Sequence, residues 1–102
     1  MKFGLKDEIL NRINAVFAQF PQIDEVILYG SRAKGNFKIG SDIDLTLKGK
    51  EISLKEILQL ESALDDLMLP YSFDISNFDK ISDIDLIDHI NRVGVLVYKR
   101  KF

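Results

Sequence analysis

The spacing of hydrophobic residues alternates along this chain between helical and extended periods, and this constrains the fold more than any other feature. Helical spacing predicts three helices, over about residues 5–20, 53–68 and 82–93. Extended spacing predicts four strands, over residues 26–29, 42–48, 71–76 and 95–98. We therefore expect one α/β (α+β) domain over residues 1–102, in the order αββαβαβ, with helices packed on a small mixed sheet of about four strands.

Bulk composition narrows the class of protein. With 46% hydrophobic residues, the chain has enough apolar side chains to build a core. It contains no cysteine, which excludes disulfides and cysteine-based metal sites. Neither a signal-peptide-like run nor a membrane-spanning stretch is present, so we expect a soluble cytoplasmic protein without membrane partners. The formal charge of −2 argues against direct binding of long nucleic acids, which usually requires a strongly basic domain.

A glycine-rich loop precedes the strand that carries the first pair of acidic residues. Gly30 ends the predicted strand 26–29, and because glycine has no Cβ, a bound group can approach its backbone closely. Ser31 offers a hydroxyl and, if a short helix begins there, main-chain N–H groups directed at an anion. Asp42 and Asp44 are two residues apart on the next strand, so both side chains leave the same face, roughly 7 Å apart at Cα. This arrangement suits Mg²⁺, which prefers oxygen ligands and commonly binds one or two carboxylates together with substrate phosphates.

Asp74 is the third acidic residue of interest. It lies on the polar side of the predicted strand 71–76 and reaches the same place if the two strands are neighbours. Three carboxylates so close repel one another, which raises at least one pKa unless cations neutralise them. Two metal ions about 3.5–4 Å apart provide this neutralisation, one activating an attacking hydroxyl and the other stabilising the departing pyrophosphate. Asp74 is then the natural proton acceptor in a reaction that depends on positioning and charge stabilisation.

The same residues resemble the signature of a known superfamily. Gly30-Ser31, ten further residues, Asp42-x-Asp44 and the later Asp74 resemble the polymerase-beta-type nucleotidyltransferases. The resemblance implies that the Gly-Ser pair contacts the nucleotide phosphates and that the three acids bind the divalent metal ions.

The similarity extends to two longer strings, residues 30–35 and 41–45, which resemble the stand-alone minimal nucleotidyltransferase (MNT) group. Arg32 and Ser41 lie in these strings, and we add them to the predicted nucleotide-binding residues. MNT proteins of this size are often encoded beside a HEPN-domain protein as the antitoxin of a toxin–antitoxin pair. Some of them neutralise the HEPN ribonuclease by attaching AMP to one of its tyrosines.

The resemblance therefore implies a Mg²⁺-dependent transfer of AMP from ATP to a HEPN-type partner. One alternative is a binding module that neutralises its partner by occlusion alone. Another is transfer to a small molecule such as an aminoglycoside, for which 102 residues leave little room.

Other patterns have simpler interpretations. The string Ser-Asp-Ile-Asp-Leu occurs a second time at residues 82–86, but there it begins a predicted helix, around which the two aspartates diverge. We interpret this copy as structural. Ser82 caps the helix, and the two aspartates lie in its first turn, where the helix dipole favours acidic side chains. His89 on the same helix is expected to be a surface or partly packed residue, inert rather than a ligand. Asp42 and Asp44 also have an alternative interpretation, in which they lie on the solvated polar face of an edge strand and bind nothing.

Some charged and apolar residues have no assigned role at this stage. Arg32, Lys34 and Lys38 either neutralise a triphosphate or only keep the loop soluble, and residues 99–101 are typical of a solvated tail. A small sheet leaves apolar surface for a partner protein, which we expect at residues 84–93 and 98–102.

Overall fold

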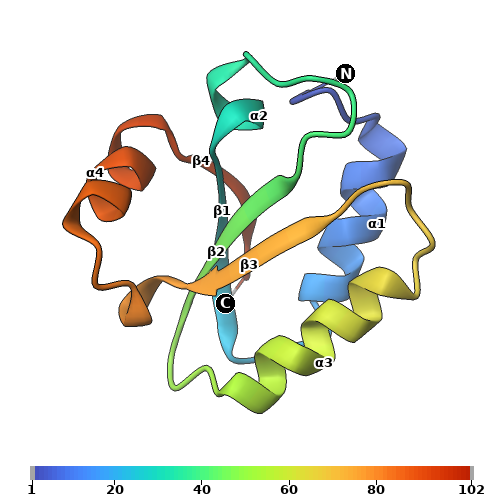
Figure 1. The fold of residues 1–102 in the computed structure, drawn as a ribbon. Coiled ribbons are helices and arrows are strands. Elements are labelled where there is room, and N and C mark those ends of the chain that lie inside the picture. The colour runs from blue at the N-terminus through green and yellow to red at the C-terminus, as the bar shows by residue number, and fades with distance from the viewer. Residues whose placement is uncertain (1, 102) are drawn as a thin grey trace.

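The structure is a computed structural model that describes residues 2–101 (Figure 1). Along this part of the chain the elements are α1 (Asp7–Phe17), β1 (Ile23–Tyr29), α2 (Ser31–Lys34), β2 (Ile43–Gly49), α3 (Leu54–Asp65), β3 (Phe73–Asn77), the 3₁₀ helix η1 (Phe78–Lys80), α4 (Ile84–Val93) and β4 (Val95–Lys99). None of the helices within residues 2–101 has the length and apolar character needed to cross a membrane.

The strands form a mixed sheet in the order β3-β2-β1-β4. β1 runs antiparallel to both β2 and β4, whereas β2 and β3 are parallel and are connected through α3. α1 and α3 cover one face of this sheet, and α4 lies on the other side next to β1 (Figure 1). The predicted fold class, a four-stranded mixed sheet with packed helices, is confirmed.

The hydrophobic core lies between the sheet and the two helices α1 and α3. Ile43, Leu45 and Leu47, predicted to point to one side of their strand, are each at most 2% exposed. They pack in one cluster with Phe17 of α1 and Leu60 of α3. Because fully burying a side chain of this size contributes roughly 1.5–3 kcal/mol, this alternation fixes the other face of β2 as the one that carries its polar residues.

Two helix starts show how far cap signals can be read from the sequence. α3 begins at the predicted capping box, in which the Glu56 N–H donates to Ser53 Oγ at 3.1 Å and the Ser53 N–H donates to Glu56 Oε1 at 3.2 Å. The predicted cap of α4 is wrong by one residue, because Asp83 rather than Ser82 accepts the first backbone N–H groups of the helix. Aspartate and serine are equally good caps, so their adjacency gives no means of choosing between them.

The boundaries of several other elements differ from those expected. α2 forms at the start of the predicted loop, where a short helix from Ser31 is a condition of the predicted anion contact, and η1 follows β3. Both are too short for hydrophobic periodicity to reveal. β1 begins at Ile23, three residues earlier than predicted, although Asp24 and Glu25 are poor strand formers. Ile23 pairs with Gly49 of β2, Glu25 pairs with both β2 and β4, and the register shifts at Asp24 between them. β2 begins at Ile43, so the strand starts one residue later than predicted.

Candidate active site

Asp44 and Asp74 lie on directly facing positions of β2 and β3. The two strands are parallel, and their register pairs Asp44 with Asp74 and, two residues on, Thr46 with Ser76. The Ser76 hydroxyl donates to Thr46 Oγ1 at 2.9 Å, so both members of that pair project from the same face of the sheet. Since side chains two residues apart share a face, the two aspartates project there as well. This is the face opposite to the core helices.

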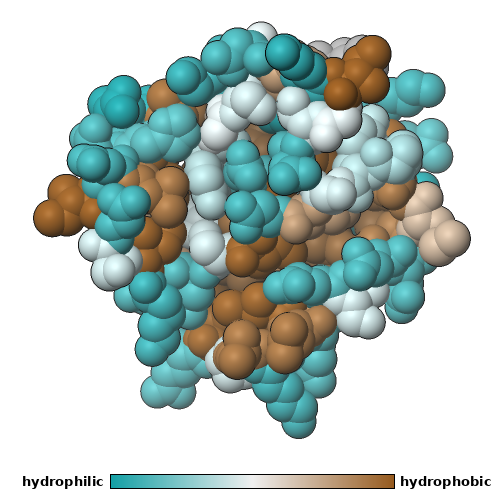
Figure 2. Space-filling model, in the orientation of Figure 1, coloured by the Kyte–Doolittle hydropathy of each residue, from teal (hydrophilic) through white to brown (hydrophobic). Residues whose placement is uncertain are grey.

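Asp42 completes the acidic group from just outside the strand. It immediately precedes Ile43, the first residue of β2, and its side chain is exposed. The Ile43 N–H donates to the Ser72 carbonyl at 2.9 Å, so the parallel ladder already holds the chain next to Asp42. In Figure 2, hydrophilic side chains gather over the upper ends of β2 and β3, while hydrophobic side chains gather below them, over α3.

The electrostatics of Asp44 reflect this crowding. Burial raises the pKa of Asp44, and the negative charges of Asp74 and then Asp42 raise this pKa further. His89 acts in the opposite direction and lowers the pKa of Asp44. The aspartate in the centre of the group therefore carries an unfavourable charge, which a cation at this place would relieve.

The donor set fits a hard divalent cation. Asp42, Asp44 and Asp74 offer only carboxylate oxygens, which are the ligands that Mg²⁺ prefers. Within residues 2–101, however, no three side chains of the His, Cys, Asp or Glu type are already gathered as a complete metal-binding group. The joint binding of metal ions by the three acids thus stays a prediction. Two of the three predicted ligands, Asp44 and Asp74, already face each other on the sheet.

The turn between β1 and α2 lies against the same acids. Gly30 has φ of 78° and ψ of −155°, a backbone conformation that side-chain-bearing residues rarely adopt. A Cβ atom at this position would collide with Asp44 Oδ2. The missing side chain of Gly30 is therefore what lets the Asp44 carboxylate approach the turn, and Ser31 follows as the first residue of α2.

Tyr29 forms part of the floor of this site, and the sequence gives no signal of it. It is only 7% exposed and is paired across the strands with Asp44. Burial raises the pKa of the Tyr29 hydroxyl, the charges of Asp74 and Asp44 raise it further, and a hydrogen bond with the Ser76 side chain opposes the rise. The hydroxyl therefore stays protonated beside the acids.

Comparison with known proteins agrees with this geometry. The sequence model of the family described as "Polymerase beta, Nucleotidyltransferase" matches residues 11–102. The chain belongs to the polymerase beta nucleotidyltransferase family. The resemblance drawn from the Gly-Ser pair and the three acids is thereby confirmed at the level of the family.

Solved structures place this nucleotidyltransferase domain among similar folds. A toxin–antitoxin crystallised with AMP-PNP has a TM-score of 0.74 at 17% identity, with 90% of this chain and 74% of the other covered. A complex described as tri-AMPylated Shewanella oneidensis HEPN toxin with MNT antitoxin has a TM-score of 0.69 at 14% identity, with 94% and 74% covered. A candidate nucleotidyltransferase from Sulfolobus solfataricus has a TM-score of 0.57 at 23% identity, with 91% and 79% covered. Comparison with curated proteins finds no match.

Arg32 has a different environment from the one expected of a nucleotide-binding residue. Its side chain is 3% exposed and lies near the rings of Phe37 and Tyr71, with its guanidinium carbon 5.2 and 5.1 Å from their centroids. Nε and Nη2 donate to the Ser41 carbonyl at 3.1 and 3.0 Å, and Nη1 donates to the Phe3 carbonyl at 2.8 Å. Arg32 therefore ties the N-terminal segment to the loop, and its predicted contact with nucleotide stays a prediction.

The rest of the loop is more open. The Ser41 hydroxyl accepts a hydrogen bond from the Lys38 N–H at 2.8 Å, which closes a turn just before Asp42. The side chains of Lys34 and Lys38 are exposed. The structure thus gives Ser41 a role in shaping the loop, and its predicted nucleotide contact stays untested.

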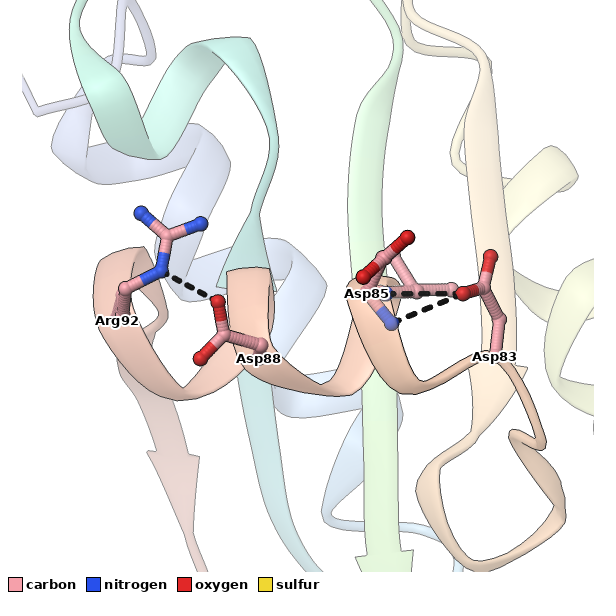
Figure 3. A network of polar contacts seen from close by, with 5 residues as sticks. Asp83, Asp85, Asp88 and Arg92 are labelled. Carbon is pink, nitrogen blue, oxygen red and sulfur yellow. Dashed lines mark hydrogen bonds and ion pairs between the residues drawn. The ribbon is translucent and has the colours of Figure 1, made fainter.

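The second Ser-Asp-Ile-Asp-Leu string forms the start of α4. Figure 3 shows Asp83, Asp85, Asp88 and Arg92 along this helix. Asp83 caps the helix, Asp85 lies in its first turn, and Asp88 pairs with Arg92 at 2.8 Å on an exposed surface. These contacts support the structural interpretation of this copy.

His89 is partly packed, one of the two environments expected for it, and it makes a contact that the sequence does not predict. Its Nε2 atom accepts a hydrogen bond from the Gly30 N–H at 3.2 Å. Its ring lies edge-on to Tyr29, with centroids 6.1 Å apart and planes at 80°. A lone histidine on an amphipathic helix gives no sequence signal for such a contact, because the contact depends on how α4 packs against β1.

The expected partner surface is only partly apolar and exposed. Ile84 at the start of α4 is 79% exposed, whereas Ile90 on the same helix is buried. Tyr98 packs edge-on against Phe17, so its ring belongs to the core side of β4. Phe102, the last residue of the predicted surface, lies outside the described residues.

Proposed function

We propose that this protein transfers AMP from ATP to a partner protein in a Mg²⁺-dependent reaction. The partner is a HEPN-type ribonuclease toxin, and this protein acts as its antitoxin. The observation that carries the proposal is the in-register pair Asp44 and Asp74 beside the Gly30 turn, in a chain of the nucleotidyltransferase family. The presence of an AMPylated HEPN toxin in a similar complex supports a protein acceptor.

In the proposed reaction, Asp42, Asp44 and Asp74 hold the metal ions, and the turn at Gly30 and Ser31 holds the phosphates. When bound, Mg²⁺ neutralises the crowded carboxylates and stabilises the negative charge of the triphosphate and of the leaving pyrophosphate.

The proton and bond changes are those of an in-line displacement. Asp74, the exposed member of the facing pair, accepts the proton of an acceptor hydroxyl. The hydroxyl oxygen forms a bond to the α-phosphorus of ATP. The bond from this phosphorus to the oxygen that bridges to the β-phosphate breaks, and pyrophosphate leaves. AMP remains on the acceptor.

The test is transfer of label from α-labelled ATP to a co-expressed HEPN-domain partner. Wild-type protein should label the partner only when Mg²⁺ is present. The double variant Asp42→Asn/Asp44→Asn should lose at least about 100-fold in rate, the order found when one catalytic charge-stabilising group is removed. The matched control is Asp85→Asn/Asp88→Asn, which also replaces two aspartates with asparagine, but at exposed positions of α4.

Two results would contradict the proposal. Wild-type protein that transfers no label to a native partner at millimolar Mg²⁺ would exclude the catalytic function. A site double variant that folds and neutralises the toxin as well as wild type would instead favour occlusion of the partner, the alternative that needs no chemistry.

A further inference from the structure

The hydrogen bond between Gly30 and His89 links two elements that are distant in the sequence. Gly30 lies at the end of β1 and His89 lies in α4, 59 residues later. In Figure 3, which looks across α4, β1 passes behind the helix and leads into α2. α4 therefore reaches the turn at Gly30 from the side of the sheet on which the acids project.

Gly30 gives this turn a backbone conformation that residues with a side chain rarely adopt. Its φ of 78° is suited to glycine, and glycine is also the residue with the greatest backbone freedom in the absence of other restraints. The Gly30 carbonyl is already engaged, because it accepts the Lys34 N–H of α2 at 3.1 Å. The Gly30 N–H is held on its other side by His89 Nε2 at 3.2 Å. The turn is thus fixed from both sides of one residue.

The histidine is itself oriented by packing. Its ring is half-buried and lies edge-on to Tyr29, the residue that precedes the turn. The next residue of α4, Ile90, is 2% exposed and anchors the helix in the protein interior. A ring nitrogen that accepts a hydrogen bond carries no proton, so this contact requires the tautomer with its hydrogen on Nδ1.

We propose that His89 is a positioning residue for the Gly30–Ser31 turn, holding the Gly30 peptide from α4 so that the turn is ready to receive the phosphates of a nucleoside triphosphate. The identity of the ligand rests on the proposed function, whereas the positioning of the turn does not. By this arrangement the packing of α4 against β1 influences nucleotide affinity, although α4 contributes none of the three acids.

Two variants separate the acceptor atom from the bulk of the ring. In His89→Gln, a side-chain amide oxygen can reach the place of Nε2 and accept from the Gly30 N–H. In His89→Leu, apolar volume remains but the acceptor is absent. Both residues are good helix formers, so the helix itself should persist in each variant. Asn91→Ala, at an exposed position of the same helix, serves as the control.

The first measurement uses NMR of the protein without nucleotide. Nitrogen shifts of the His89 ring should show the proton on Nδ1. Hydrogen exchange at the Gly30 amide should become about three- to tenfold faster in His89→Leu, the change expected for one net hydrogen bond. Exchange in His89→Gln and in Asn91→Ala should stay close to wild type. A proton on Nε2, or equal exchange in the Gln and Leu variants, would overturn the positioning role.

The second measurement is the affinity for ATP in the presence of Mg²⁺, by calorimetric titration. His89→Leu should bind about three- to tenfold more weakly than wild type, and His89→Gln should recover most of the loss. Unchanged affinity in His89→Leu, despite faster Gly30 exchange, would overturn the link between α4 and nucleotide binding. If even the wild type bound no ATP, the proposed function would fail, and the NMR measurement would still decide whether His89 holds the turn.

Discussion

Replacing Asp44 with asparagine should stabilise the folded protein while it removes activity. Neighbouring strands are about 4.8 Å apart, so ionised carboxylates on facing positions repel by about 0.9 kcal/mol in water and about 3.5 kcal/mol at an effective dielectric of 20. Because Asp74 is exposed, the lower end of this range applies. Asparagine has nearly the same size and no charge, so Asp44→Asn should gain about 1 kcal/mol at neutral pH, or about 4 °C in melting temperature.

The pH dependence of this gain follows from the pKa of Asp44. Burial, Asp74 and Asp42 raise this pKa, so the folded protein binds the Asp44 proton more tightly than the unfolded chain does. The unfavourable contribution of the charge is therefore present at neutral pH and disappears as the pH falls through the raised pKa. The stability difference between Asp44→Asn and wild type should shrink over the same descent.

Urea denaturation in the presence of a chelator, along a descending pH series, measures the effect. Asp85→Asn is the control, because Asp85 lies in the first turn of α4, where an acid is favourable and its loss should not stabilise. Added Mg²⁺ should then stabilise wild type more than Asp44→Asn, since a ligand stabilises only the state that binds it. A variant that is less stable than wild type at neutral pH without metal would refute the argument from repulsion.

Three further predictions concern the turn, the loop and the floor of the site. Gly40→Ala, at a positive φ with open space around it, should cost about 1–2 kcal/mol. Gly30→Ala should cost about 1–3 kcal/mol more because its methyl group meets a carboxylate; equal costs in urea denaturation would contradict this. Arg32→Met leaves two carbonyls without their donors and should lose about 2–4 kcal/mol, whereas exposed Lys34→Met should change thermal stability little. In an ultraviolet titration, the signal that Tyr29→Phe removes should ionise above the ordinary tyrosine range, because burial and the neighbouring carboxylates raise this pKa; ionisation within that range would count against the proposed floor.

The sequence predicted the parts of the site that depend on local periodicity. The strict alternation around Asp44 identifies both the buried and the polar face of β2, because a one-residue error would turn every apolar side chain to solvent. Asp74 could be assigned to the polar side of its own strand in the same way. The two acids face each other because β2 pairs with β3. The sequence does not predict this pairing, so the meeting of the acids was conditional on it.

The contacts that the sequence could not predict all come from tertiary packing. His89 reaches the Gly30 N–H because α4 packs against β1. No spacing of residues in the sequence predicts this contact. Arg32 looked like a free cation in a glycine-rich loop, but Phe37 and Tyr71 lie against its guanidinium, and two backbone carbonyls accept its protons. Loop composition alone cannot separate these environments.

The parallel ladder between β2 and β3 also determines which changes the domain can absorb. Asp44 and Asp74 are separated by the whole α3 crossover, yet main-chain hydrogen bonds between the strands, and not the length of that crossover, set the distance between them. Residues inserted around α3 leave the two acids opposite each other. A single residue inserted within β3 before Asp74 reverses the face from which that carboxylate projects. Diverging relatives should therefore vary in the length of the α3 crossover and keep the strand segments at constant length.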